Sequence, residues 1–88
     1  MVRKEIKILN KHGLHTRPAT ALVTLVSKFK SDVFLEYKGV KVNAKSILGL
    51  LVLAVEPGAN LIVEANGVDE QEVVDNLDRL AQQKFNLE

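Results

Sequence analysis

The residues around His15 have the types and the spacing that carrying a phosphoryl group requires. The run Gly13-Leu14-His15-Thr16-Arg17-Pro18-Ala19 places this histidine directly before residues that can open a helix. A neutral imidazole is nucleophilic near pH 7, because its unperturbed pKa is about 6.5. It can hold a phosphoryl group as a labile phosphoramidate. We therefore predict that His15 is a phosphate-carrying histidine.

A helix that begins beside His15 would help to hold the phosphate. Pro18 suits the first turn of a helix, where a missing N–H leaves no hydrogen bond unmade. The backbone amides of Thr16 and Arg17 would be free to bind phosphate oxygens, and the Arg17 guanidinium matches their geometry. Each exposed helix-dipole interaction contributes only roughly 0.3–1 kcal/mol, so the phosphate should stay transferable. A lone histidine before a helix is more often a plain loop residue, but this combination favours the carrier.

The rest of the chain alternates short strands with helices. Apolar alternation predicts a first strand containing Ile6 and Ile8, and further strands over 33–37, 40–42 and 61–65. Lys38-Gly39 predicts a two-residue hairpin turn between the second and third strands. Helical spacing predicts helices over 16–30, over 47–53 and from Asp69, with Glu72 completing a capping box.

The element order βαββαβα predicts an α+β fold with one mostly antiparallel four-stranded sheet and the helices on one face. The 88 residues form one domain, 1–88. The first helix should bury one face and leave the other polar; the polar face comprises Thr20, Thr24, Ser27, Lys28 and Ser31.

The motif around His15 resembles the phosphorylation motif of HPr, the histidine-containing phosphocarrier family of the bacterial sugar phosphotransferase system. The resemblance covers essentially the whole chain, including the runs Lys45-Ser46-Ile47-Leu48-Gly49 and Asp69-Glu70-Gln71. It implies an open-faced β-sandwich and phosphorylation of His15 at its ring Nδ1. It also implies that enzyme I, charged from phosphoenolpyruvate, is the donor and that IIA domains of sugar permeases are the acceptors. Such a chain is a relay rather than an enzyme, and we expect no cofactor and no metal.

Ser46 is predicted to be the N-cap of the second helix, where its hydroxyl accepts a backbone N–H. In the family, the matching serine is the target of a regulatory kinase. The resemblance therefore implies phosphorylation by an HPr kinase/phosphorylase and reading of the product by a carbon-control transcription regulator. A phosphate at Ser46 would add roughly −2 charge beside an apolar surface.

The helix that follows Ser46 is apolar nearly all round, so one sheet cannot bury all of its side chains. An exposed apolar patch beside an active residue is typical of a docking surface. The resemblance points to Ile47, Leu48 and Leu51 for this patch, next to Thr20 and Thr24 on the first helix. Deep packing of the helix is the alternative, and for Leu51 both interpretations stay open.

His12 departs from the family pattern, in which this position commonly carries a small polar residue. The simpler interpretation is a solvated turn residue. The functional interpretation is that its ring gives the phosphate a hydrogen bond or a positive charge when protonated. We do not expect His12 to be a second phosphorylation site, because no helix start adjoins it.

Composition argues against several other functions. A formal net charge of +1 and 5% aromatic residues do not favour nucleic-acid binding. The absence of Cys and the presence of two His leave little for a metal site, and no nucleophile–base pair indicates a hydrolase. No apolar run reaches the roughly 20 residues that span a bilayer. We expect a cytoplasmic monomer without direct membrane insertion.

One competing function keeps the same fold. A similar carrier could serve a regulatory or nitrogen-related phosphotransfer chain without sugar transport. The Ser46 run favours the sugar or carbon-control role.

Overall fold

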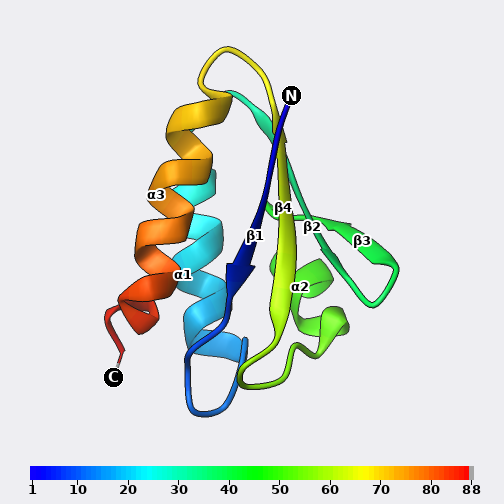
Figure 1. Cartoon of the computed structure of the whole chain (residues 1–88), viewed down its shortest axis with the longest axis vertical. Helices are drawn as coiled ribbons and strands as arrows, with labels where there is room; N and C mark the ends of the chain where they lie inside the picture. Colours follow the sequence, from blue (N-terminus) through cyan, green and yellow to red (C-terminus); the bar gives the residue numbers. More distant parts are fainter. Residues whose placement is uncertain (88) are drawn as a thin grey trace.

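Four strands form one antiparallel sheet in the computed structural model, which describes residues 1–87 (Figure 1). The strands are β1 (Val2–Lys7), β2 (Asp32–Tyr37), β3 (Val40–Asn43) and β4 (Asn60–Asn66). Their order across the sheet is β1-β4-β2-β3, and every neighbouring pair is antiparallel. The predicted order of elements and the predicted sheet type are therefore confirmed.

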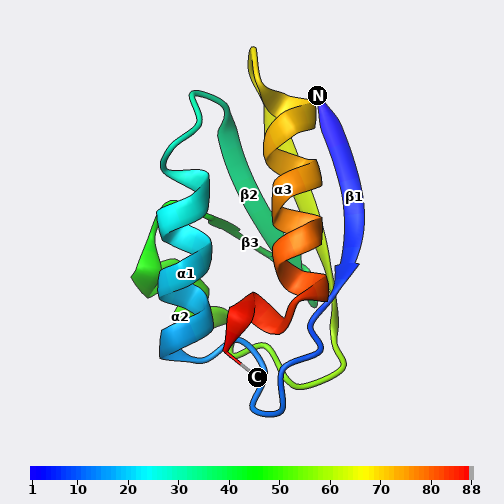
Figure 2. The same ribbon diagram turned by 90° about the vertical axis from the view of Figure 1, so that its left-hand side faces the viewer.

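The helices cover one face of this sheet, which leaves an open-faced sandwich. They are α1 (Thr16–Val26), α2 (Ile47–Leu53), α3 (Glu70–Gln82) and the short 3₁₀ turn η1 (Lys84–Asn86). Figure 2 shows α1 and α3 side by side in front of the sheet. The shorter α2 packs against α1 and β3. None of these helices has the length and apolar character to cross a membrane.

The alternation of side chains between the two faces of each strand explains which strand residues form the core. On β2 and β4 the inward side chains are fully buried: Val33, Leu35, Leu61, Val63 and Ala65. The helices close over them with side chains at helical spacing, including Leu22 and Val26 of α1 and Val73, Val74 and Leu77 of α3. The hairpin turn has positive φ at both central residues, 52° at Lys38 and 80° at Gly39, as a tight two-residue turn requires.

Helix α1 ends four residues earlier than the predicted helix over 16–30. After Val26 the amides of Lys28 and Phe29 bond three residues back, which tightens the chain into turns. The next two amides, at Lys30 and Ser31, donate to the carboxylate of Asp69 instead of to helix carbonyls. A contact from a distant segment thus takes the amides that would have continued the predicted helix to residue 30 and beyond.

The predicted capping box at Asp69 and Glu72 is wrong. Asp69 is the N-cap residue of α3, but its side chain makes no cap hydrogen bond because it is committed to residues 30 and 31. Glu70 instead accepts a hydrogen bond from the Gly67 amide at 3.1 Å. Ser31 also differs from its predicted polar-face position: it is buried and its hydroxyl donates to Asp69.

Candidate functional site

His15 is the N-cap residue of α1, with an extended backbone at φ −89° and ψ −168°. Its carbonyl accepts the first helical hydrogen bond, from the Ala19 amide at 2.9 Å. Its imidazole makes no cap hydrogen bond and is half-buried. The ring is therefore positioned by the helix start and keeps its nitrogens for other partners.

The loop before His15 is hydrogen-bonded on both sides to distant segments of the same chain. The Leu14 amide donates to the Val55 carbonyl at 3.0 Å, and the buried Asn10 amide group donates to the Lys84 carbonyl at 2.8 Å. Gly13 has φ 72°, and a Cβ at this position would lie 2.1 Å from the Val55 oxygen. Only glycine fits a backbone that approaches so closely.

The groups predicted to bind phosphate are available. Thr16 and Arg17 are the first residues of α1, as predicted, and both are exposed. Within residues 1–87 their amides have no hydrogen-bond partner, and the Arg17 guanidinium forms no ion pair. A helix N-terminus with free amides and a nearby guanidinium attracts an anion.

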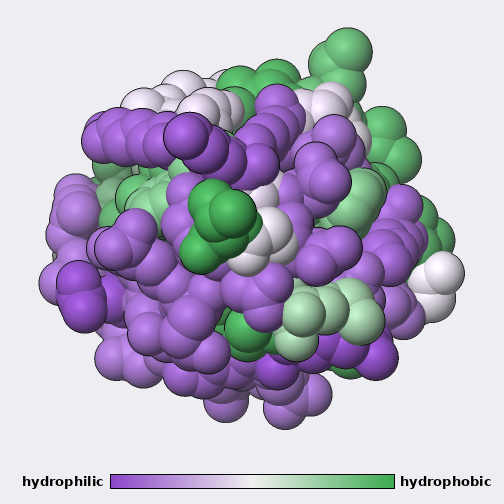
Figure 3. All heavy atoms as spheres, turned by 90° about the horizontal axis from the view of Figure 1, so that it is seen from above, coloured by the Kyte–Doolittle hydropathy of each residue, from purple (hydrophilic) through white to green (hydrophobic). Residues whose placement is uncertain are grey.

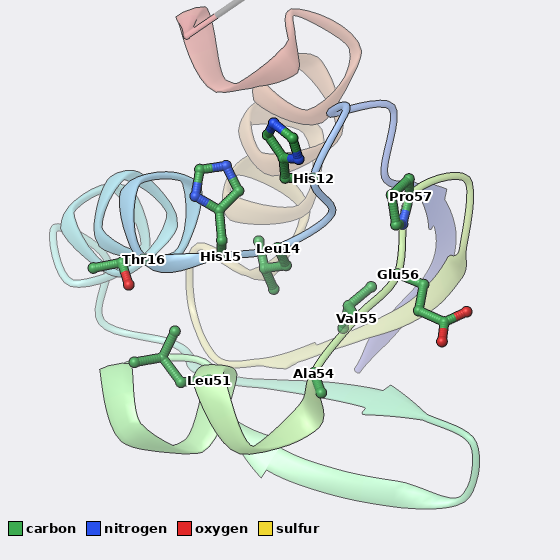
Figure 4. A pocket seen from close by; sticks show the side chains of 9 residues that line it. All are labelled: His12, Leu14, His15, Thr16, Leu51, Ala54, Val55, Glu56 and Pro57. Carbon is green, nitrogen blue, oxygen red and sulfur yellow. The ribbon is translucent and has the colours of Figure 1, made fainter.

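A pocket of about 380 Å³ lies between the His15 loop and the α2–β4 connection (Figure 4). It is lined by His12, Leu14, His15, Thr16, Leu51, Ala54, Val55, Glu56 and Pro57. In Figure 4 the His12 and His15 rings project from the loop in the same direction, and Leu51 of α2 faces the loop from below. The pocket thus joins the histidine pair to the apolar helix α2.

The structure brings His12 and His15 together. Their ring centroids are 5.9 Å apart and the ring planes meet at 75°. The two rings are not hydrogen-bonded to each other in the described chain, and His12 is exposed. The described residues contain no group of three His, Cys, Asp or Glu side chains that could hold a metal.

Ser46 is the N-cap of α2, as predicted. Its hydroxyl accepts the Gly49 amide at 3.2 Å, and the residue is half-buried. Beside it, the Lys45 ammonium donates to the Phe29 carbonyl at 2.9 Å, which ties the start of α2 to the end of α1. The serine lies on a helix start that packs against α1, the helix that begins at His15.

The predicted docking residues differ in exposure. Leu48 is 73% exposed, whereas Ile47 and Leu51 are half-buried. Thr20 and Thr24 are exposed on α1, where the Thr20 hydroxyl donates to the Thr16 carbonyl at 2.8 Å.

Sequence reasoning missed Val52, which is 74% exposed. Val52 comes four residues after Leu48, so the two side chains lie on the same face of α2. This spacing could have indicated from the sequence that Val52 is exposed together with Leu48. Leu48 and Val52 thus form the most exposed part of this helix.

The carboxyl groups with lowered pKa values lie elsewhere in the fold. The Ser31 hydroxyl, and then the Lys30 and Ser31 amides, lower the pKa of Asp69. The Lys41 ammonium lowers the pKa of Glu64 on β4, where the two groups are 2.6 Å apart. Neither carboxylate lines the His15 pocket.

Comparison with known proteins agrees with this geometry. The family model described as the PTS HPr component phosphorylation site matches residues 2–83. The chain is 45% identical over 84 residues to the HPr-like protein Crh of Bacillus subtilis (strain 168), covering 96% of this chain and 99% of Crh. The HPr structure from Thermoanaerobacter tengcongensis has a TM-score of 0.96 at 43% identity, covering 100% of this chain and 99% of that one.

A small α+β phosphocarrier is the class that the fold and these matches define. The chain belongs to the HPr family. A crystal structure of Bacillus subtilis Crh, described as a swapped dimer, matches with a TM-score of 0.76 at 45% identity, covering 96% of this chain and 97% of that one.

Proposed function

We propose that the chain accepts a phosphoryl group on His15 from phospho-enzyme I and passes it to IIA domains of sugar permeases. The observation that carries this proposal is the His15 ring at the start of α1, free of cap bonds, beside the free amides of Thr16 and Arg17. Family membership supports the same role.

The chemistry is a transfer between nitrogen atoms. The lone pair of His15 Nδ1 attacks phosphorus, a nitrogen–phosphorus bond forms, and the bond from phosphorus to the donor ring breaks. The α1 amides and Arg17 bind the phosphoryl oxygens while the group moves. Since these donors are exposed to water, they hold the phosphate loosely enough for the reverse attack by an acceptor.

Incubation with phosphoenolpyruvate and enzyme I tests this function. We expect an acid-labile, base-stable phosphate that is absent from the His15→Ala variant. Arg17→Ala should still be labelled, at a lower rate. An unlabelled wild-type chain, or label that survives in His15→Ala, would overturn the proposal.

We also propose that Ser46 is a regulatory phosphorylation site for an HPr kinase/phosphorylase and that a carbon-control transcription regulator binds the product. The hydroxyl at the start of α2 supports this, because the first amides of a helix tolerate a phosphate there. The added charge lies beside the exposed apolar face of α2 and would oppose docking of enzyme I. ATP-dependent label that is lost in Ser46→Ala tests the idea.

The docking surface that we propose comprises Leu48 and Val52, with Ile47 and Leu51 at its border and Thr20 and Thr24 across from it on α1. Leu51 connects this surface to the His15 pocket, because it is one of the residues that line the pocket. Enzyme I and IIA domains would use this surface in turn.

A regulatory carrier is the second candidate, since the similar protein Crh is described as a catabolite-repression protein. A IIA domain separates the two functions: transfer of label to it supports sugar transport, while label that stays on the chain supports regulation. Either role places the chain in the cytoplasm, with its partner enzymes.

We propose that the chain is a monomer, because β1 pairs within the same chain with β4 along its whole length. Similar proteins include dimers: the Crh crystal structure is described as a swapped dimer and a Thermoanaerobacter tengcongensis HPr structure as a dimer. Light scattering during gel filtration decides the state, and a mass of twice 9.7 kDa would overturn the monomer.

A further inference from the structure

His12 is the chemical group near His15 that the proposed transfer does not use. It is exposed, lines the same pocket and projects in the same direction as the His15 ring (Figure 4). The ring centroids are 5.9 Å apart, and the two rings are not hydrogen-bonded to each other in the described residues. The space between the rings is therefore open to a group carried by His15.

The backbone at His12 is fixed, so this proximity is built into the loop. The turn around it closes through a hydrogen bond from the Gly13 amide to the Asn10 carbonyl at 3.1 Å. Asn10 before the turn and Leu14 after it are tied to Lys84 and Val55, respectively. A ring on a backbone held in this way loses only side-chain freedom when it binds a neighbouring group.

We propose that His12, in its imidazolium form, donates a ring N–H hydrogen bond to the phosphoryl group on His15 and so makes retention of the phosphate depend on pH. His12 is then a positioning residue for the transferred group. This inference rests on the proposed function, because it requires a phosphoryl group on His15.

The surrounding charges are compatible with this role. Lys11 lies in the same loop, Arg17 on α1 and Lys84 on η1, and all are cationic. The pocket contributes one carboxylate, Glu56, whose side chain points away from the two rings in Figure 4. Among the described residues that line the pocket, a dianionic phosphoryl group on His15 would therefore be the anion on the side to which the His12 ring projects.

Thermodynamic linkage sets the size and sign of the effect. An adjacent negative charge favours the protonated imidazole, so the titration midpoint of His12 should rise by about one pH unit when His15 is phosphorylated. By reciprocity, protonating His12 should favour the loaded state about tenfold. The advantage is fully present well below the ordinary histidine pKa of about 6.5 and is lost as the pH rises through the raised midpoint.

Proton NMR of the His12 ring, with and without enzyme I and phosphoenolpyruvate, tests the proposal. We expect the upward shift of the His12 titration midpoint on phosphorylation of His15 to persist in 1 M salt, where charges separated by more than about 3 Å are screened. His12→Gln should abolish the matching pH dependence in the phosphorus signal and in the loading equilibrium, relative to wild type. Glu56→Gln, which alters the carboxylate that points away, should leave the shift in place.

The outcomes separate two kinds of failure. Phosphate on His15 without a shift at His12, or with a shift that salt removes, would overturn the role of His12 alone. Absence of any phosphate on His15 would instead overturn the proposed function and this inference with it.

Discussion

Gly13 shows how one residue without a side chain sets the position of His15. Its φ is 72°, and a Cβ on this backbone would lie 2.1 Å from the Val55 oxygen, which excludes any other residue. Gly13→Ala should therefore destabilise the fold and displace the His15 loop. A non-glycine residue at such a φ costs roughly 1–2 kcal/mol, and the overlap with the carbonyl adds to that cost. Urea denaturation measures the loss.

Gly58 offers a matched control for Gly13. It also has a positive φ, 78°, but a Cβ there would meet nothing within 4 Å. Gly58→Ala should cost only the conformational strain. Equal losses of unfolding free energy in the two variants would show that the close approach to Val55 adds nothing to the cost of Gly13→Ala.

Asp69 makes stability depend on pH, because its hydrogen bonds favour the carboxylate. Its pKa is lowered in the folded state, chiefly by the Ser31 hydroxyl and then by the Lys30 amide. The stabilisation is therefore present above the ordinary aspartate pKa of about 3.9 and is lost as the pH falls through the lowered value. Asp69→Asn should lower the urea midpoint at pH 7 and flatten its decline below about pH 4.

Asp75 controls for a general effect of removing one negative charge from α3. Its side chain accepts a single exposed hydrogen bond from Gln71. Asp75→Asn should keep the acid-induced decline of the wild type. If Asp75→Asn also flattened the decline of the urea midpoint below about pH 4, Asp69 would not be its specific cause.

At the scale of elements, local pattern was enough to predict α2 and its N-cap. Ser46 and the helix over 47–53 appear where the sequence placed them, since the cap hydrogen bond lies within three residues. The His15 helix start was predictable for the same reason. The end of α1 was not, because the Asp69 carboxylate comes from a segment 38 residues further along the chain.

The candidate site also contains some contacts that a local sequence pattern predicts and others that depend on distant segments. The proximity of His12 to His15 follows from three residues of sequence separation. By contrast, the contact of Gly13 with Val55 depends on how α2 is connected to β4. No periodicity in the chain reports such a contact between two loops.

Helix α2 makes a testable docking prediction. Leu48→Asp should slow phosphoryl transfer from enzyme I by about tenfold, which corresponds to a loss of about 1.4 kcal/mol. Because Leu48 is 73% exposed, the folded state should lose little stability. Transfer rates at several enzyme I concentrations, with a denaturation curve for each variant, measure both effects.

Val68 is the matched control for Leu48. It is 89% exposed and lies between β4 and α3, at the opposite end of the molecule from the His15 loop (Figure 1). Figure 3 views this end, where apolar side chains form small groups among hydrophilic ones. Val68→Asp should leave the transfer rate unchanged, and an equal slowing in both variants would argue against a localised docking surface.

At the scale of the whole molecule, the C-terminal turn closes the core beside the His15 loop. Lys84, Phe85 and Asn86 all have positive φ, between 53° and 61°, which is unfavourable for residues other than glycine. Phe85 is nevertheless buried, at 2% exposure, and the Lys84 carbonyl accepts the hydrogen bond from Asn10. Burial of the aromatic ring thus offsets a strained turn and anchors the loop that precedes His15.

Phe85→Ala should therefore weaken the fold and loosen the His15 loop together. Loss of a buried phenylalanine side chain costs about 3–5 kcal/mol. Without the ring the strained turn has little to hold it, so the hydrogen bond between Asn10 and Lys84 should open. Urea denaturation measures the first effect, and faster hydrogen exchange at the Gly13 and Leu14 amides measures the second.

Phe85→Leu separates these two effects, because it keeps an apolar side chain over the same core. It should retain most of the stability and the slow exchange at Gly13 and Leu14. If Phe85→Ala destabilised the protein while exchange at these amides changed no more than at the β4 amides, the C-terminal turn would serve the core alone. Selective loosening of the loop would instead show that the end of the chain helps to position His15.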